Sequence, residues 1–351
     1  MTAQVERQAV GRVGGERPRR RANRVRMTVV AVVSLAVLLA GVVWALSIGS
    51  QPIPLSTVLR SVFGGDSPDE TIVQIVRLPR VVLAVVVGAN LAVSGALMQG
   101  ITANPLASPD IMGVNAGAAV CVVLAVTTIP VLVGTPSVLL AFVGAAAAGI
   151  TVMVLAGMGG GRVSPVRLTL AGVTASTLLI SLTQVLVIFH ENDAQRVLFW
   201  LVGGVNSANW DSVGTVLPWT VAGLAAAMAL ARAMNLLALG EDMARGLGQN
   251  VERTRALGAA VVIVLCGASV AVAGPIAFIG LIVPHIARRL VGTSYAAVLP
   301  VCVVVGAALT VYADIASRFV NPPFEVPSGV VSALIGAPIF IYLARRQKAT
   351  T

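Results

Sequence analysis

The chain has 351 residues, of which 57% are hydrophobic and only 11% are charged, and its mean hydropathy is +0.93. An ordinary soluble domain is about a quarter charged, so this composition excludes a typical water-soluble fold and indicates a protein whose solvent is lipid. The net charge of +10 could suggest nucleic-acid binding, but the basic residues lie in short segments between apolar runs. We therefore expect no nucleic-acid partner and interpret these segments as topology determinants.

Residues 1–26 form a basic arm with few large apolar side chains, and we expect this arm to be disordered on the cytoplasmic side. A continuous apolar run follows from Met27 to Gly49. A secretory signal peptide is the alternative, but its apolar core usually spans only about 7 to 15 residues. The run therefore favours a retained transmembrane helix.

Further apolar runs of helix length follow, and each matches the roughly 20 residues that cross a bilayer core of ~30 Å. We expect an all-α polytopic membrane protein with ten transmembrane helices, a transmembrane domain over residues 27–346 and a tail over 347–351. The predicted crossings are residues 27–49, 78–98, 112–131, 137–157, 167–189, 214–233, 256–273, 276–292, 295–313 and 328–344.

The basic residues test this topology. With ten crossings, 19 of the 24 Lys and Arg residues fall on the side of the N-terminus and five on the other side. Because positive charge accumulates on the cytoplasmic side, both termini are predicted to be cytoplasmic.

A polar break interrupts the stretch from Arg77 to Ala119, at Asn104-Pro105 and Ser108-Pro109-Asp110. Irregular backbone at membrane depth is tolerated only inside protein or beside a water-filled cavity, so the break predicts a path through the protein. Residues 92–107 and 271–287 share an AVxG start and similarly spaced Gly, Pro and Ala. They form a candidate inverted repeat, with chance similarity among Ala/Val/Gly-rich helices as the alternative.

Catalytic chemistry and metal binding are poorly supported. His190 and His285 lie in different segments, the three cysteines lie in apolar runs without CxxC or Cys/His spacing, and the glycines of 157–163 lack the Lys-Ser/Thr of a phosphate-binding loop. We expect no catalytic residue, no metal site and no cofactor in this chain, so any ATP must be hydrolysed by another chain. An ion-coupled secondary transporter usually carries carboxylates in mid-span. Here the acidic residues cluster in loops or at helix ends, and Asp314 and Glu325 are the two that lie nearest the membrane. The lack of mid-span carboxylates disfavours this alternative without excluding it.

Several spaced motifs, in order from about residue 27 to the C-terminus, resemble the FecCD-type permeases, the membrane subunits of bacterial ABC importers for ferric siderophores, haem and vitamin B12. The motifs are RLPR with SGALMQGITANPLASPDIMGVNAGA, LTLAGVTAS (168–176), FWLVGGVNSANW (199–210), NLLALGEDMARGLG (235–248), GPIAFIGLIVPHIARRLVG (274–292) and ADIASR with EVPSGVVSALIGAPIFIYL (313–343).

The resemblance implies a cell-membrane permease that works with a second permease, identical or paralogous. It also implies two ATPase subunits, which bind ATP and Mg, and an extracytoplasmic substrate-binding lipoprotein. Ferric siderophore is the favoured cargo, with haem and vitamin B12 as alternatives. Transport would proceed by alternating access, driven by the ATPase subunits.

The resemblance also assigns sites. The cytoplasmic loop of residues 232–255 would couple to the ATPase, although Glu241 and Arg245 could merely support a local helix. The residues expected to contact the ATPase are Leu239, Gly240, Glu241, Ala244, Arg245, Gly246 and Gly248.

On the outer face, Arg77, Arg80 and Arg318 match arginines that receive carboxylates of the binding protein, a role suited to the guanidinium fork. Interfacial anchoring is the alternative, and Asp314, one turn before Arg318, could hold part of its charge. Glu325 matches an acidic family position without a defined role.

The path is expected between the two permeases, with a constriction near the loop before the fifth crossing. The expected path and gate residues are Pro165, Val166, Thr174, Ser176, Ser181 and Gln184. The alternative for those with hydroxyl groups is that they hold helices together, as such groups commonly do in membranes.

Overall fold

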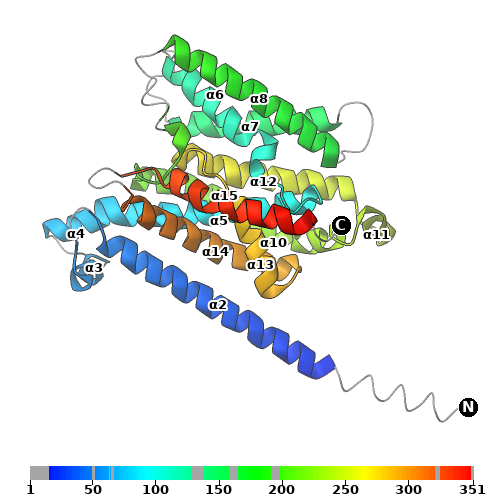
Figure 1. The fold of residues 1–351 in the computed structure, drawn as a ribbon, viewed down its shortest axis with the longest axis horizontal. Coiled ribbons are helices and arrows are strands. Elements are labelled where there is room, and N and C mark those ends of the chain that lie inside the picture. Colours follow the sequence, from blue (N-terminus) through cyan, green and yellow to red (C-terminus); the bar gives the residue numbers. More distant parts are fainter. Residues whose placement is uncertain are drawn as a thin grey trace, which may run out of the picture.

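The computed structural model describes residues 16–49, 52–62, 64, 67–127, 137–157, 165–190, 198, 200–320 and 325–348, and within them all regular secondary structure is helical (Figure 1). The helices are α2 (Glu16–Ser47), α3 (Leu55–Val62), α4 (Pro68–Ile72), the π-helical turn η1 (Val73–Arg77), α5 (Leu78–Ile101), the 3-10 turn η2 (Pro109–Met112), α6 (Val114–Thr127), α7 (Ser137–Gly157), α8 (Pro165–Phe189), α10 (Trp210–Leu237), α11 (Glu241–Gly246), α12 (Val251–Ala273), α13 (Ile279–Val291), α14 (Tyr295–Ser317) and α15 (Ser328–Lys348).

Each predicted crossing coincides with a helix, but the helices differ in length. Seven described helices are long and apolar enough to span a membrane, and two further apolar segments, Val114–Ala125 and Ser328–Ile341, are shorter. α13 has only 13 residues. The chain is therefore a multi-pass membrane protein, while the count of ten crossings stays a prediction.

The N-terminal arm differs from its prediction. α2 begins at Glu16, so residues 16–26 continue the first membrane helix as helix and are not unstructured; residues 1–15 lie outside the described part. Good helix formers and arginines fill this segment, which can extend a helix once the apolar run nucleates it. Arg26 then donates to the main-chain carbonyls of Arg289 and Leu290 at the end of α13, at 2.8 and 2.7 Å.

α5 lies at the centre of the bundle. Of the seven long spans it is the most buried, with 89% of its apolar window covered, and it packs against α10, α12, α13 and α14. α6, α7 and α8 form a separate layer on one side, and α2 lies along the opposite side (Figure 1). α5 and α14 meet at paired glycines: a Cβ on Gly88 would lie 2.3 Å from the carbonyl oxygen of Gly306. Small residues let membrane helices approach this closely.

The candidate inverted repeat does not share a local structure. Gly95, in the first segment, lies inside the continuous helix α5. The corresponding Gly274 ends α12 with φ +64° and starts the extended break before α13. The two segments therefore fold differently where their sequences match.

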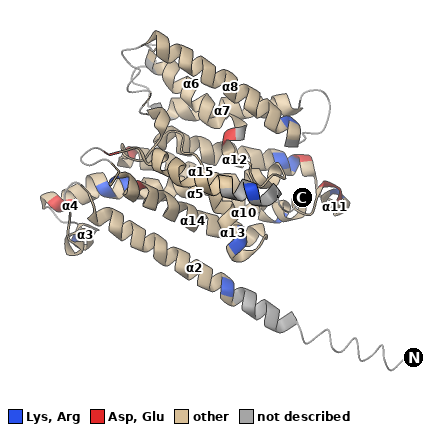
Figure 2. Cartoon of the chain, viewed as in Figure 1, with Lys and Arg blue, Asp and Glu red and all other residues tan. Residues whose placement is uncertain are grey.

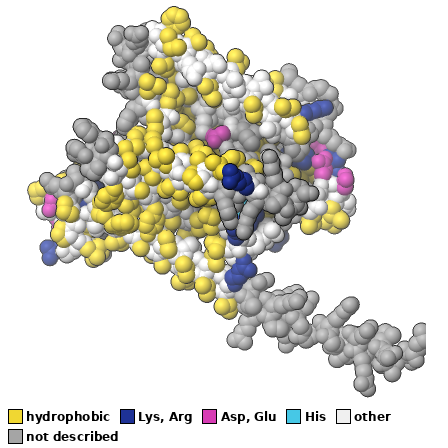
Figure 3. Space-filling view, in the orientation of Figure 1, with side chains coloured by type: hydrophobic (Ala, Val, Ile, Leu, Met, Phe, Trp, Pro, Cys, Tyr) yellow, Lys and Arg dark blue, Asp and Glu magenta, His cyan; other side chains and the backbone are white. Residues whose placement is uncertain are grey.

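Charge is distributed as a bilayer requires. Most charged residues gather at two ends of the long helices, near α3 and α4 at one end and near α11 and α13 at the other (Figure 2). Hydrophobic side chains cover most of the middle of the visible face (Figure 3). α11, the C-terminus and the start of α2 lie at the same end (Figure 1), which is the predicted cytoplasmic end; we call the opposite end the outer end.

Candidate functional sites

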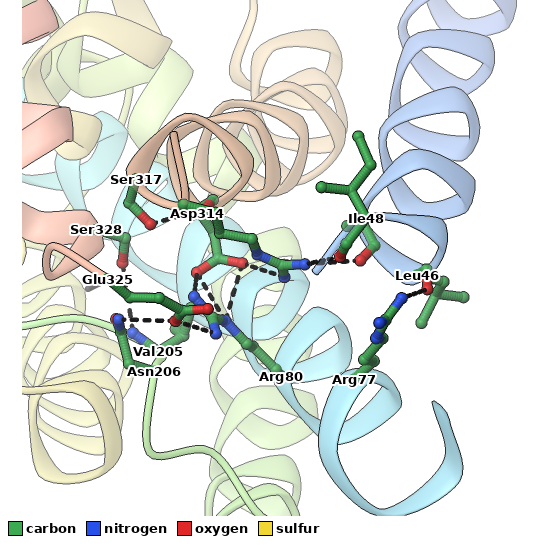
Figure 4. Close-up of polar contacts among 12 residues, drawn as sticks. Leu46, Ile48, Arg77, Arg80, Val205, Asn206, Asp314, Ser317, Glu325 and Ser328 are labelled. Carbon is green, nitrogen blue, oxygen red and sulfur yellow. Dashed lines mark hydrogen bonds and ion pairs between the residues drawn. The ribbon is translucent and has the colours of Figure 1, made fainter. Parts of the chain in front are cut away.

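Arg80 joins three parts of the chain at the outer end (Figure 4). It lies in the first turn of α5, and its Nε donates to both carboxylate oxygens of Asp314 on α14, at 3.0 and 3.1 Å. Its Nη1 lies 2.6 Å from Oε2 of Glu325, in the segment that leads into α15. One guanidinium thus fixes the start of α5 to the end of α14 and to the approach to α15.

Asp314 is the buried centre of this cluster. Besides Arg80, it accepts a hydrogen bond from Nη2 of Arg318, one turn later on the same helix, at 2.7 Å. Its side chain is only 2% exposed. Loss of the charge on this buried carboxylate would remove an ion-pair partner from Arg318 and, among the described residues, leave Arg80 paired with Glu325 alone.

Two of the arginines cap α2. The last carbonyls of a helix lack intrahelical partners and favour cations. Nη1 of Arg77 donates to the carbonyl of Leu46 at 2.7 Å, and Nη1 of Arg318 donates to those of Ala45 and Ile48, at 2.8 and 2.6 Å. Main-chain N–H groups bond the carbonyls of the neighbouring Trp44 and Ser47.

The predicted docking arginines are therefore brought together, but they are not open to solvent. Arg77 and Arg80 are 6% and 7% exposed, and the side chain of Arg318 is 6% exposed. Their guanidinium groups hold α2, α5 and α14 together at the outer end. Glu325, for which the sequence offered no role, is the exposed member of the cluster, with a side chain 39% exposed.

At the cytoplasmic end, ion pairs hold the short helix α11 against α12. Nη2 of Arg245 lies 2.5 Å from carboxylate oxygens of both Glu241 and Glu252, and Nη2 of Arg255 lies 3.0 Å from Glu241. Glu241 and Arg245, predicted to contact the ATPase, thus bond within the chain as the local-helix alternative expected. The pairs Arg245–Glu252 and Arg255–Glu241 therefore link α11 to α12.

The small residues of the predicted coupling loop have different roles. Gly240 and Gly248 have φ values of +103° and +81°, which other residues rarely adopt, and they begin and end the α11 turn. Around Gly246, as around these two, no atom lies within 4 Å of where a Cβ would be. Ala244 is completely buried, so its small side chain packs α11 on the bundle, and its contact with the ATPase stays a prediction.

Three apolar side chains on this loop project outward, and two of them were missed by the sequence analysis. Leu239, Met243 and Leu247 are 61%, 59% and 57% exposed and follow each other at intervals of four residues. We call these three residues the α11 ridge. The available sequence signal was the presence of three large apolar residues in a loop that is predicted to lie outside the membrane.

A groove of about 740 Å³ lies beside the α11 ridge. It is bounded by the loop after α5, the end of α10 and the turn between α13 and α14. Arg288 and Tyr295 line it, with the guanidinium 5.9 Å from the centre of the tyrosine ring.

The polar residues of α8 divide into two groups. Thr174, Ser181 and Gln184 are exposed and lie on one helical face together with Thr177, which the sequence analysis did not select. We call these four residues the α8 stripe. Ser176 lies off this face and its Oγ is buried, at 3.4 Å from where a Cβ on Gly113 would be.

The stripe belongs to the least covered span of the seven, since only 11% of the apolar window of α8 is buried. Pro165 opens α8, although its side chain lies outside the described part, and Val166 in the same turn is exposed. The preceding residues 158–164, which include most of the predicted constriction, also lie outside the described part.

Comparison with known proteins identifies the family. A model of the FecCD transport family matches residues 35–346. The chain is 43% identical over 333 residues to the Fe(3+)-citrate import system permease protein YfmD of Bacillus subtilis, covering 94% of this chain and 97% of that protein. It is 41% identical over 303 residues to the cobalamin import system permease protein BtuC of Halobacterium salinarum, covering 86% and 81%. A solved structure of a proposed metal-chelate type ABC transporter in an inward-facing conformation superposes with a TM-score of 0.78 and 30% identity, covering 91% of this chain and 99% of that one. The chain belongs to the FecCD transport family.

Proposed function

We propose that this chain is the membrane-spanning subunit of an ATP-driven importer that moves a ferric chelate into the cell by alternating access. The relatives named above are import permeases, which supports the transport class. The structural observation that carries the proposal is the α11 ridge: three large apolar side chains exposed at the predicted cytoplasmic end.

The α11 ridge suits a partner ATPase. Exposed apolar side chains beyond the membrane gain free energy when a protein covers them, because apolar surface leaves water. The ion pairs Arg245–Glu252 and Arg255–Glu241 tie α11 to α12, so a displacement of α11 would be passed to a helix that runs through the bundle. ATP and Mg would be bound by the partner, and this chain would supply no catalytic group or cofactor.

The α8 stripe suits the path between two permeases. It combines hydroxyl and amide groups with apolar neighbours on a face that this chain leaves uncovered. A second permease, identical or paralogous, would cover that face, and a path lined in this way would let a bulky chelate pass without holding it.

At the outer end, a substrate-binding lipoprotein would dock over the cluster of Arg77, Arg80 and Arg318. Because these arginines are largely buried, a docking carboxylate would reach them at Nη1 of Arg80, the atom that the partly exposed Glu325 now binds.

Two alternatives differ in cargo or energy source. Cobalamin or haem would use the same architecture, and the nearly equal identity to the ferric-citrate and cobalamin relatives does not separate them. An ion-coupled secondary transporter would need a carboxylate free to exchange its ion. Asp314 already binds Arg80 and Arg318, which disfavours that mechanism.

Affinity purification followed by reconstitution tests the proposal. The tagged chain should co-purify with an ATPase, and proteoliposomes containing the complex should take up radio-iron-labelled ferric siderophore only when ATP is present on the ATPase side. Competition with unlabelled ferric citrate, haem and cobalamin assigns the cargo. Uptake by the purified chain alone under an ion gradient would contradict the importer assignment.

A further inference from the structure

The two carboxylates that bind Arg80 differ in how firmly they are held. Asp314 is 2% exposed and binds both Arg80 and Arg318, so its release would break two buried ion pairs. Glu325 is 39% exposed, and besides Arg80 its Oε2 accepts only a long hydrogen bond from Nδ2 of Asn206, at 3.4 Å, within the described part of the chain. Of the two carboxylates, Glu325 is therefore the more exposed and the less extensively bonded (Figure 4).

Glu325 lies directly before α15. The following residues bond to the loop before α10: the Ser328 hydroxyl accepts from the N–H of Val205 at 3.3 Å, and the N–H of Gly329 donates to the carbonyl of Gly203 at 3.1 Å. The N–H of Val326 donates to the carbonyl of Ser317, at the end of α14, at 3.4 Å. A cavity of about 200 Å³ adjoins this segment and gives it room to shift. A displacement of Glu325 would therefore also displace the start of α15, three residues further along the chain.

We propose that Glu325 is an internal competitor for the partner's carboxylate. It occupies Nη1 of Arg80 until an acidic side chain of the extracytoplasmic binding protein replaces it, and its release loosens the start of α15. This inference rests on the proposed function, because it requires a docking partner at the outer end.

The exchange is balanced in charge. One carboxylate leaves the guanidinium and another arrives, so no buried charge is left unpaired at either stage. The released Glu325 is already partly exposed and can be solvated. Docking would thus free the approach to α15 while Asp314 keeps α5 and α14 together.

Binding measurements on the intact complex test this inference. The permease–ATPase complex is placed in nanodiscs, and the co-purifying binding protein, expressed without its lipid anchor, serves as the probe. Glu325→Gln and Glu325→Ala should lower the Kd for the probe by roughly three- to tenfold, because a competing internal state is removed. Hydrogen exchange of residues 326–331 without the probe should become faster.

Asp211→Asn is the matched control, since it removes the same charge from an exposed position at the outer end, in the first turn of α10. It should leave both the Kd and the exchange rates unchanged. Unchanged or weaker binding by both Glu325 variants would overturn the competitor role, and weaker binding would show that Glu325 itself contacts the partner. A wild-type complex with ATPase activity that binds no probe would instead overturn the outer-end docking, and the competitor role with it.

Discussion

Gly95 of α5 packs against Gly280 of α13 so closely that a Cβ atom on Gly95 would come within 1.8 Å of the carbonyl oxygen of Gly280. The obstacle is main chain, which cannot rotate away as a side chain can. This contact places the start of α13, directly after the extended break at 274–277, against the most buried span. The position of α13 therefore depends on the absence of a side chain at residue 95.

Gly95→Ala should separate α5 from α13 and destabilise the folded permease by about 1–3 kcal/mol or more, as overpacking does. The free energy of unfolding in mixed detergent micelles measures this effect. Gly214→Ala on α10, where no atom lies within 4 Å of the added Cβ, should leave stability unchanged or slightly raised. Equal stability of the two variants would contradict the close contact.

Asp314→Asn should be strongly destabilising, by about 3–5 kcal/mol, because it leaves Arg80 and Arg318 without their buried countercharge. Glu325→Gln removes a carboxylate from the same arginine at a partly exposed position and should cost at most about 1 kcal/mol. Thermal unfolding of both variants in one detergent makes the comparison. Similar losses would show that burial does not distinguish the two acids.

Replacing Met243 and Leu247 together by serine should weaken the recovery of the ATPase with the permease at least tenfold, since it removes most of the apolar surface of the α11 ridge. The ion pairs that hold α11 are untouched, so the permease should unfold at the same temperature. Leu59→Ser, at an equally exposed apolar residue of the outer end, serves as control and should retain the ATPase. Full recovery of the ATPase with the double variant would show that the ATPase contacts the permease at a different surface.

Ser181→Cys should react with a membrane-impermeant thiol reagent in the assembled transporter, because the α8 stripe is expected to line the path. Ile180→Cys is also exposed in this chain but points about 100° away around the helix, toward lipid or a neighbouring helix, and should react much more slowly. Both are made with Cys121, Cys266 and Cys302 replaced by alanine. Equal rates would argue against a path on this face.

Much of the fold followed from the sequence. The apolar runs predicted where helices lie, because a helix is one of the few structures that satisfies its backbone groups within lipid. The spaced motifs identified the family, and the basic residues indicated which ends share a side. These are local properties: run length, composition and spacing along one chain.

The contacts of the candidate sites depended on tertiary structure. The sequence paired Arg318 with Asp314 one turn away, but it could not show that Arg80, 234 positions away, binds the same carboxylate. It also could not show that Arg77 and Arg318 cap α2, that Ala244 faces inward, or that Ser176 lies off the α8 stripe. An arginine that docks a partner and one that caps a helix have the same local sequence, because the difference lies in which distant carbonyl or carboxylate reaches the guanidinium after the helices have packed.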